Sequence, residues 1–140
     1  MKKLFIAIII FIVFGCNDSN QNNPVIGTSK KIGFIEIAEH DFTDLMNWED
    51  AKKACGGLGS GWRLPTKGEL NLLYANRSEI GGFKEFALYS YWSSEGISDR
   101  PTKYYWNAWA KHFSQGDEYS GQFLKMGTDN RIFVRAVRTY

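Results

Sequence analysis

Apolar and polar residues are strongly segregated at the start of the chain. Eleven consecutive apolar residues occupy positions 4–14, and Lys2 and Lys3 precede them. The next stretch, residues 17–23, contains only polar side chains. From Pro24 to the end of the 140-residue chain, apolar and polar positions are mixed as in a globular protein. The pattern predicts a short apolar leader, a polar connecting segment and one domain.

Two helices are predicted in the first half of this domain. Asn47 is a good N-cap, and the apolar residues after it recur at spacings of three and four until Gly56 and Gly57. Farther along, Thr66 and Glu69 have the spacing of a capping box, in which each side chain accepts a hydrogen bond from the other residue's backbone N–H. The buried face of this second helix would contain Leu70, Leu73 and Tyr74.

Extended strands are predicted before and after the two helices. Residues 32–38 alternate well enough to form one strand. After Gly82, short aromatic runs separated by turn residues predict antiparallel strands joined by hairpins, at residues 89–94, 104–114, 122–126 and 132–138. Two helices followed by a meander describe an α+β domain.

The leader has the order of a secretory signal, with a charged start, an apolar middle and a small residue at the cut. Residues 13–16, Val-Phe-Gly-Cys, resemble the bacterial lipobox, in which the cysteine is acylated and becomes the first mature residue. The resemblance predicts a signal peptide over residues 1–15, a lipidated Cys16 with a flexible tether over 16–29, and a domain over 30–140. The lipid bilayer would then be a partner through acylated Cys16, because several acyl chains anchor a protein stably.

Two other interpretations of the leader stay open. One is a plain signal peptide cut elsewhere. The other is an uncleaved anchor, although eleven apolar residues reach only about half of the ~20 needed to span a bilayer. By the sorting rules known for enterobacterial lipoproteins, Asn17 would not retain the protein in the inner membrane. We therefore expect a lipid-anchored protein of the bacterial cell envelope, located in the outer membrane.

Charge excludes one class of partner. The chain has 17 Lys and Arg against 15 Asp and Glu, and removal of residues 1–15 takes away only Lys2 and Lys3. The remaining body carries no net charge, whereas nucleic-acid binding needs a concentrated basic surface. We expect no nucleic-acid partner.

Five motifs occur in the order found in a known bacterial domain. They are NWEDAKKAC (47–55), GWRLPTKGEL (61–70), YWSSE (91–95), AWAKHFSQG (108–116) and FVRAVR (133–138). Together they resemble the C-terminal domain of the Legionella collagen-like adhesin, over about residues 30–139. The resemblance implies a C-type-lectin-like fold, with two helices packed on a small, mainly antiparallel sheet and with long loops. It implies binding at cell surfaces and no chemistry, so we expect no catalytic residue and no enzyme.

The resemblance also divides the conspicuous residues into two groups. The structural group would build the core and hold loop carbonyls, and Arg135 and Arg138 could instead form a basic edge; its members are Trp48, Trp62, Arg63, Leu64, Pro65, Trp92, Arg135 and Arg138. The ligand-binding group combines aromatic rings with nearby cations, as binding surfaces do. Its members are Lys103, Tyr104, Tyr105, Trp106, Lys111 and Arg131. An anionic ligand such as a sulfated glycan could be held by Lys103, Lys111, Arg131 and Arg135.

Metal and cofactor sites receive little support. The triplet Trp106-Asn107-Ala108 lacks the carboxylate that calcium-dependent lectins place after Trp-Asn. We expect no cofactor and no metal, although loop carboxylates at Asp99, Asp117, Glu118 and Asp129 could supply oxygens to calcium. The predicted function is binding of a glycan or an envelope protein, as in an adhesin. The alternative is a non-catalytic structural or assembly component of an envelope complex.

Overall fold

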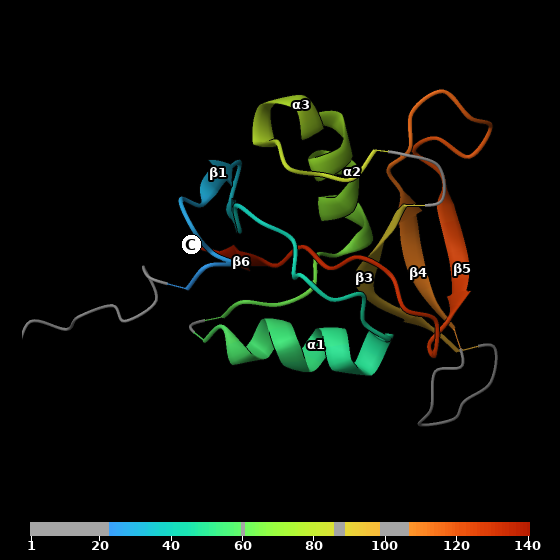
Figure 1. Ribbon diagram of the computed structural model, residues 1–140, viewed down its shortest axis with the longest axis horizontal. Helices are drawn as coiled ribbons and strands as arrows, with labels where there is room; N and C mark the ends of the chain where they lie inside the picture. The colour runs from blue at the N-terminus through green and yellow to red at the C-terminus, as the bar shows by residue number, and fades with distance from the viewer. Residues whose placement is uncertain (1–22, 60, 86–88, 99–106) are drawn as a thin grey trace, which may run out of the picture.

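The computed structural model describes residues 23–59, 61–85, 89–98 and 107–140. Within these ranges the chain forms two three-stranded antiparallel sheets and three helices (Figure 1). The first sheet has the order β1-β2-β6 and consists of β1 (Lys30–Ile32), β2 (Ile35–Ile37) and β6 (Val137–Thr139). The second is a meander of β3 (Ser90–Ile97), β4 (Asn107–His112) and β5 (Phe123–Gly127).

Capping residues define where the two longer helices begin. In α1 (Trp48–Gly57), the Asn47 side chain accepts a hydrogen bond from the Asp50 backbone N–H at 2.8 Å. In α2 (Lys67–Ala75), Thr66 and Glu69 form the complete capping box. Both caps confirm the sequence prediction. A third helix, α3 (Arg77–Ile80), was not predicted, because its four residues follow α2 after a single residue.

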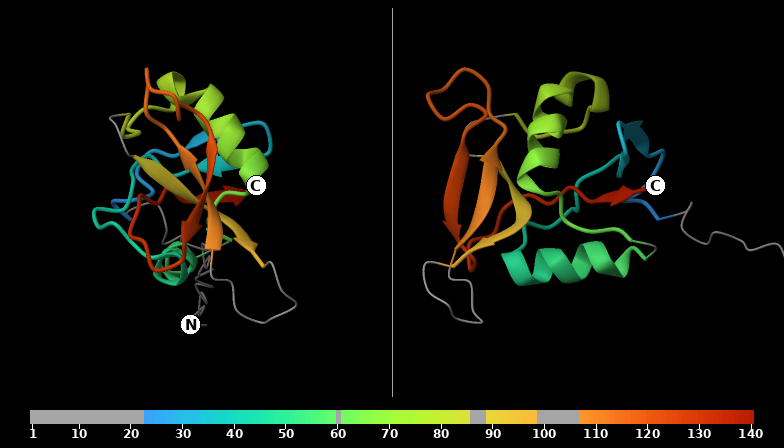
Figure 2. Two further views of the ribbon diagram at one scale, coloured as in Figure 1. Left: turned by 90° about the vertical axis from the view of Figure 1, so that its right-hand side faces the viewer. Right: turned by 180° about the vertical axis from the view of Figure 1, so that it is seen from behind.

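The two sheets lie at opposite ends of the domain, and the helices lie between them. In Figure 1, α1 and α2 lie on the two sides of the C-terminal segment that runs from β5 back to β6. Figure 2 shows that the described chain begins on the same side as the C-terminus, beside the β1-β2-β6 sheet. The β3-β4-β5 sheet therefore lies at the end of the domain away from both ends of the described chain. In the described part of the chain, none of the helices is long and apolar enough to cross a membrane.

Two strand predictions were wrong in detail. Residues 32–38 do not form one strand, because the chain turns at Gly33, whose φ is +59°, and β1 pairs with β2 as a hairpin. Residues 132–138 do not extend the meander as a fourth strand. Only β6 joins a sheet at this end of the chain, and it pairs with β2. Before β6 the segment forms single bridges, from Ile132 to Met46 and from Phe133 to Tyr91.

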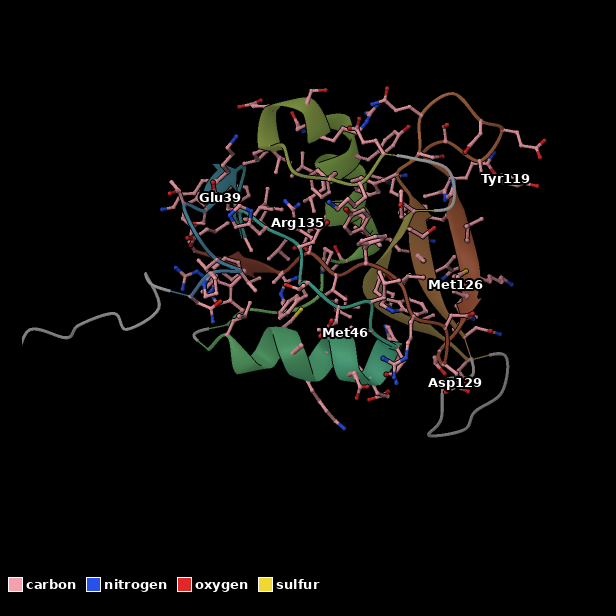
Figure 3. The ribbon with its side chains drawn as sticks, in the orientation of Figure 1. Glu39, Met46, Tyr119, Met126, Asp129 and Arg135 are labelled. Atoms are coloured by element: carbon pink, nitrogen blue, oxygen red, sulfur yellow. The ribbon has the colours of Figure 1, made fainter. Side chains whose placement is uncertain are left out.

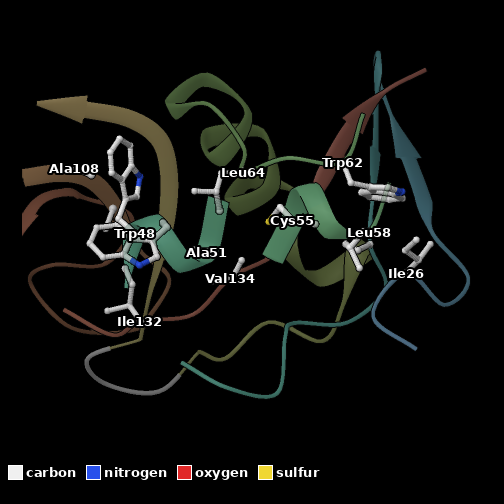
Figure 4. Packing of buried hydrophobic residues seen from close by; sticks show 14 residues of the cluster. Ile26, Trp48, Ala51, Cys55, Leu58, Trp62, Leu64, Ala108, Ile132 and Val134 are labelled. Atoms are coloured by element: carbon white, nitrogen blue, oxygen red, sulfur yellow. The ribbon is translucent and has the colours of Figure 1, made fainter. Parts of the chain in front are cut away.

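The buried side chains form two clusters. The larger one contains Trp48, Trp62 and Trp92 together with Leu64, so these predicted core residues are buried, as is Pro65. Figure 4 shows Trp48 and Trp62 near opposite ends of α1. The indole N–H of Trp92 donates to the Met46 carbonyl at 2.8 Å, close to the start of α1. The second cluster lies under α2 and includes Leu70, Leu73, Tyr91 and Phe113.

The packed domain begins earlier than predicted. Residues 23–29 were assigned to the tether, but Ile26 is buried in the larger cluster. The backbone N–H groups of Glu39 and His40 donate to the carbonyls of Ile26 and Val25 at 2.9 and 3.1 Å. Two apolar residues in a polar segment were enough to attach it to the core. The domain boundary therefore lies at or before Asn23 and not at Lys30.

Candidate functional site

Arg63 and Arg138 have structural roles at the β1-β2-β6 end. The Arg63 guanidinium donates to both carboxylate oxygens of Glu69 at 2.7 and 2.8 Å, and to the Leu64 carbonyl at 3.1 Å. This geometry fixes the WRLP loop to the capping box of α2. Arg138 Nε donates to Glu36 Oε2 at 2.7 Å, and its guanidinium lies 4.9 Å from the Trp62 ring centroid.

Arg135 is fully buried, so it forms no basic edge and holds no external anion. Its Nε donates to Asp41 Oδ1 at 2.6 Å, and its Nη1 donates to the carbonyls of Ala38 and Gly81, each at 3.3 Å. Figure 3 shows Arg135 in the interior, between β1 and the helices. The suggestion that Arg135 helps to bind an anionic ligand was wrong, because its positive charge is already compensated inside the core.

Lys111 is also buried, with only 3% of its surface exposed. Its ammonium donates to Asn71 Oδ1 at 2.8 Å and to the Gly121 carbonyl, and it lies 4.3 Å from the Phe123 ring centroid. Burial lowers the pKa of Lys111 from its ordinary value. The prediction of an exposed ligand contact at Lys111 was wrong, since α2 and the Gly121 turn cover the ammonium.

The other predicted ligand residues are placed differently. Lys103, Tyr104, Tyr105 and Trp106 lie outside the described residues. Arg131 is exposed, between β5 and the bridge at Ile132. Arg131 thus stays a prediction as a ligand contact.

A surface that the sequence analysis missed lies on strands β4 and β5 of the meander. Trp109 on β4 and Phe123 on β5 are partly exposed, with ring centroids 6.5 Å apart in an edge-to-face arrangement. Lys67, the first residue of α2, places its ammonium 3.9 Å from the Trp109 centroid and 4.7 Å from the Phe123 centroid. Lys125, directly opposite Trp109 in the sheet, lies 5.7 Å from the same indole. We call these four residues the aromatic–lysine surface.

The local sequence explains how this surface forms. In β4, Ala108 and Ala110 are buried, and Trp109 between them is directed to the opposite face of the sheet. Lys67 reaches that face because the backbone N–H of Lys67 donates to Glu95 Oε2 on β3 at 2.8 Å, which fixes the start of α2 against the sheet. The alternation of residues in β4 could have predicted the exposed face of Trp109 from the sequence. The contact of Lys67 with this ring could not have been predicted, because it depends on how α2 packs.

Ser90, His112 and Asp117 lie in a row that has the composition of a hydrolytic triad. Ser90 Oγ is 3.0 Å from His112 Nδ1, and His112 Nε2 is 3.4 Å from Asp117 Oδ2. Ser90 is buried at the first position of β3, so a substrate cannot reach its hydroxyl. Asp117 also accepts from the Ser114 hydroxyl at 2.6 Å and from the Tyr119 backbone N–H at 2.9 Å. The row therefore closes the turn after β4.

Carboxylates do not gather into a metal site in the part of the chain that the structure describes. No group of three or more His, Cys, Asp or Glu residues there could hold an ion. Hydrogen bonds from Ser114, and then from the turn that follows, hold the pKa of Asp117 below its ordinary value. Asp99 lies outside the described residues. A loop-bound calcium therefore stays a prediction.

Solved structures with the same arrangement define the class of protein. EMS16, described as an antagonist of the collagen receptor integrin α2β1, is 12% identical with a TM-score of 0.56, and the match covers 80% of this chain and 97% of that one. Botrocetin is 11% identical with a TM-score of 0.55, covering 84% and 98%. A chain in the complex of the von Willebrand factor A1 domain with botrocetin matches with a TM-score of 0.51, 12% identity and the same coverage. The domain therefore has a C-type-lectin-like α+β fold.

The sequence itself identifies the family. The Lcl C-terminal domain matches residues 20–138, so the chain belongs to this family. The resemblance inferred from the five motifs is confirmed. No curated protein is similar enough to the chain to count as a match.

Proposed function

We propose that this protein is a lipoprotein of the bacterial envelope whose lectin-like domain binds a glycan through the aromatic–lysine surface, as an adhesin does. The observation that carries the proposal is the contact of the Lys67 ammonium with the rings of both Trp109 and Phe123. Lys125 adds a second cation directly opposite Trp109 in the sheet. Ligand binding is also the general use of this fold class, although fold alone does not name the ligand.

The chemistry of the surface favours a glycan with acidic groups. A sugar ring can pack its C–H groups against the partly exposed rings of Trp109 and Phe123. The Lys67 ammonium contacts the ring faces through a cation–π interaction, which does not use its N–H groups in directed hydrogen bonds. These N–H groups can therefore still donate to a ligand. A carboxylate or sulfate of the glycan would accept from Lys67 and Lys125. Glu95 accepts a hydrogen bond from the Lys67 backbone N–H, and its negative charge would weaken the binding of an anion placed next to it.

A glycan array tests this proposal. The segment from Asn23 onward contains both core clusters, and it can be applied with calcium and again with a chelator. We expect Trp109→Ala and the pair Lys67→Gln with Lys125→Gln each to weaken binding at least about tenfold, which is ~1.4 kcal/mol. Lys53→Gln, on the exposed side of α1, is the matched control. Unchanged binding by the Lys67/Lys125 variant would exclude this surface. Loss with chelator would instead favour calcium held by loop carboxylates.

A protein partner is the second candidate. It is supported by the likeness of the fold to EMS16, an antagonist of the collagen receptor integrin α2β1, and to a chain of the complex between the von Willebrand factor A1 domain and botrocetin. The partner would be an envelope protein, and the domain would then act as a structural or assembly component. If the array shows no binding, crosslinking from the aromatic–lysine surface in intact cells should identify one envelope protein, and the Lys67/Lys125 variant should lose that crosslink.

Two further parts of the proposal concern location and chemistry. The resemblance of residues 13–16 to a lipobox supports acylation of Cys16, and Asn17 after it favours the outer membrane. Cys16→Ala should abolish labelling with radioactive palmitate, and equal labelling of the variant would contradict the anchor. We also propose that the protein is not an enzyme, because the serine of its one triad-like row among the described residues is buried.

A further inference from the structure

Two of the most exposed aromatic side chains in the described ranges lie together at the end of the domain far from the aromatic–lysine surface. Phe34 is 84% exposed and Tyr140 is 58% exposed. The Tyr140 hydroxyl donates to the Gly33 carbonyl at 2.8 Å, and the Tyr140 backbone N–H lies 3.4 Å from the Phe34 carbonyl. The C-terminal residue is therefore attached to the tip of the β1-β2 hairpin.

The hairpin geometry keeps Phe34 in solvent. Ile32 and Ile35 are directly paired, so Gly33 and Phe34 form a two-residue turn between them. Gly33 has a φ of +59°, which a residue with a side chain would adopt at a cost. Because the turn is tight and Tyr140 binds it, Phe34 cannot fold back onto the core. Phe34 is therefore available to any apolar surface that reaches the hairpin tip.

One lysine of β1 borders the Tyr140 ring, and a second lies at the opposite end of the hairpin. Lys31 Nζ lies 4.1 Å from the Tyr140 ring centroid, and the Lys30 ammonium binds the Glu79 carbonyl. The nearby acid Glu36 is neutralised by Arg138 at 2.7 Å, which leaves the exposed Glu79 side chain as the opposing charge on α3. An apolar tip with a basic border is suited to a membrane surface with anionic lipids, in which aromatic rings enter the interface and lysines contact headgroups.

The position of these residues relative to the proposed lipid anchor indicates which surface would cover them. We call Lys30, Lys31, Phe34 and Tyr140 the hairpin patch, because they belong to the β1-β2 hairpin or contact its turn. Strands β1 and β6 lie on the side where the described chain begins (Figures 1 and 2). Asn23 lies seven positions after Cys16, and seven steps along the chain span at most about 25 Å. A lipid on Cys16 would therefore hold this end of the domain within reach of the bilayer.

We infer that the hairpin patch rests on the membrane to which Cys16 is anchored, and that it orients the domain with the aromatic–lysine surface away from the bilayer. The inference rests on the proposed lipid anchor. Contact of Phe34 with the interface adds to the anchoring by acyl chains and restricts the rotation of the domain about its tether. A ligand in the aqueous phase can then reach Trp109 and Lys67 without competing with lipid.

A fluorescent label tests this orientation on the full lipidated chain. Phe34→Cys introduces one reactive thiol, because Cys55 is fully buried and Cys16 is acylated in the proposed protein. The labelled protein is reconstituted into vesicles of phosphatidylethanolamine and phosphatidylglycerol, with and without nitroxide-bearing lipid. The same label on Tyr119→Cys, an exposed aromatic position in the turn beyond β4, is the matched control. We expect the label at position 34 to emit at shorter wavelength and to be quenched by the nitroxide lipid, and the label at 119 to do neither.

The variant Lys30→Gln with Lys31→Gln should reduce the quenching at position 34, and so should added salt, because both weaken attraction to anionic headgroups. Equal quenching at positions 34 and 119 would overturn the inference. A shift to shorter wavelength without quenching would also overturn it, since another copy of the chain would then cover the patch. If the protein does not float with the vesicles, the lipid anchor fails. If the protein floats with the vesicles and the label at position 34 stays in water, the lipid anchor is supported and only the membrane contact of the hairpin patch is rejected.

Discussion

Arg135 Nε donates to Asp41 Oδ1 at 2.6 Å across 94 positions of the sequence. The arginine side chain is fully buried and the aspartate side chain is 8% exposed. The same guanidinium lies 4.2 Å from the Phe83 ring centroid and bonds the Gly81 carbonyl. One side chain therefore connects the segment after β2, the segment after α3 and the C-terminal segment, which are the parts of the fold with little regular structure of their own.

Removal of this arginine should reduce the free energy of unfolding strongly. Arg135→Met leaves the buried Asp41 carboxyl without its ion-pair partner, while the Tyr91 hydroxyl still donates to it; breaking a buried pair typically costs about 3–5 kcal/mol. The double variant Asp41→Asn with Arg135→Met should lose less than the sum of the two single variants, because it leaves no unpaired charge. Urea titrations of the four proteins measure this. Lys52→Met, at the exposed pair with Glu49, should cost no more than about 1 kcal/mol. Equal losses at Arg135 and Lys52 would contradict the account.

Trp62 provides a test of the WRLP loop as core. The residue is 3% exposed in the larger cluster, and in the described part of the structure its buried indole N–H has no acceptor. Trp62→Ala should cost about 3–5 kcal/mol in urea titrations. Trp62→Phe should cost clearly less, since it fills most of the space and removes an unpaired donor. Phe34→Ala, at the exposed hairpin tip, is the control and should change stability by less than about 0.5 kcal/mol. A small loss for Trp62→Ala would make the loop a binding candidate.

Features that depend on neighbouring residues were predictable from the sequence. Asn47 and Thr66 cap their helices through partners three residues away, so their signals are complete within one turn. The apolar spacing also placed Leu70 and Leu73 in the core correctly. These local rules sufficed for both long helices.

Features that depend on distant residues were not predictable in the same way. The residues of β6 look like the continuation of a meander strand, but Arg138 pairs with Glu36 across 102 positions and β6 joins β2. Lys111 looks exposed as a lysine between aromatic residues, and only the packing of α2, through Asn71, covers it. The aromatic–lysine surface was missed for the same reason, because Lys67 and Trp109 meet only when α2 packs on the sheet.

Glu69 makes stability depend on pH at the acidic side. Burial alone would raise the pKa of Glu69, but hydrogen bonds from Arg63 and from the Thr66 backbone outweigh it and hold the pKa below the ordinary value. A carboxylate with a lowered folded-state pKa stabilises the fold above its unfolded pKa and loses that contribution as pH falls through the folded-state pKa. Glu69→Gln should therefore reduce the free energy of unfolding by about 1 kcal/mol near neutral pH, and the difference from the parent protein should shrink in acid.

Urea titrations of both proteins across the acidic range measure that difference. Glu49→Gln is the matched control, because Glu49 on the exposed side of α1 pairs only with Lys52 in the described structure. Its stability should follow the parent at every pH. A Glu69→Gln difference that stays constant into acid would show that the carboxylate charge contributes nothing to folding.

Cys55 should report on global unfolding. The residue is fully buried on α1, and burial raises the pKa of its thiol to about 12. Because the thiolate is the reactive form, a maleimide should not modify Cys55 in the folded domain near neutral pH, whereas the thiol should react rapidly in urea. The segment from Asn23 onward contains no other cysteine, so mass spectrometry of the modified protein counts this site alone. Destabilised variants such as Trp62→Ala should react faster under native conditions, in proportion to their unfolded fraction. Fast reaction of the parent domain without urea would contradict the buried position and would make Cys55 a candidate reactive thiol.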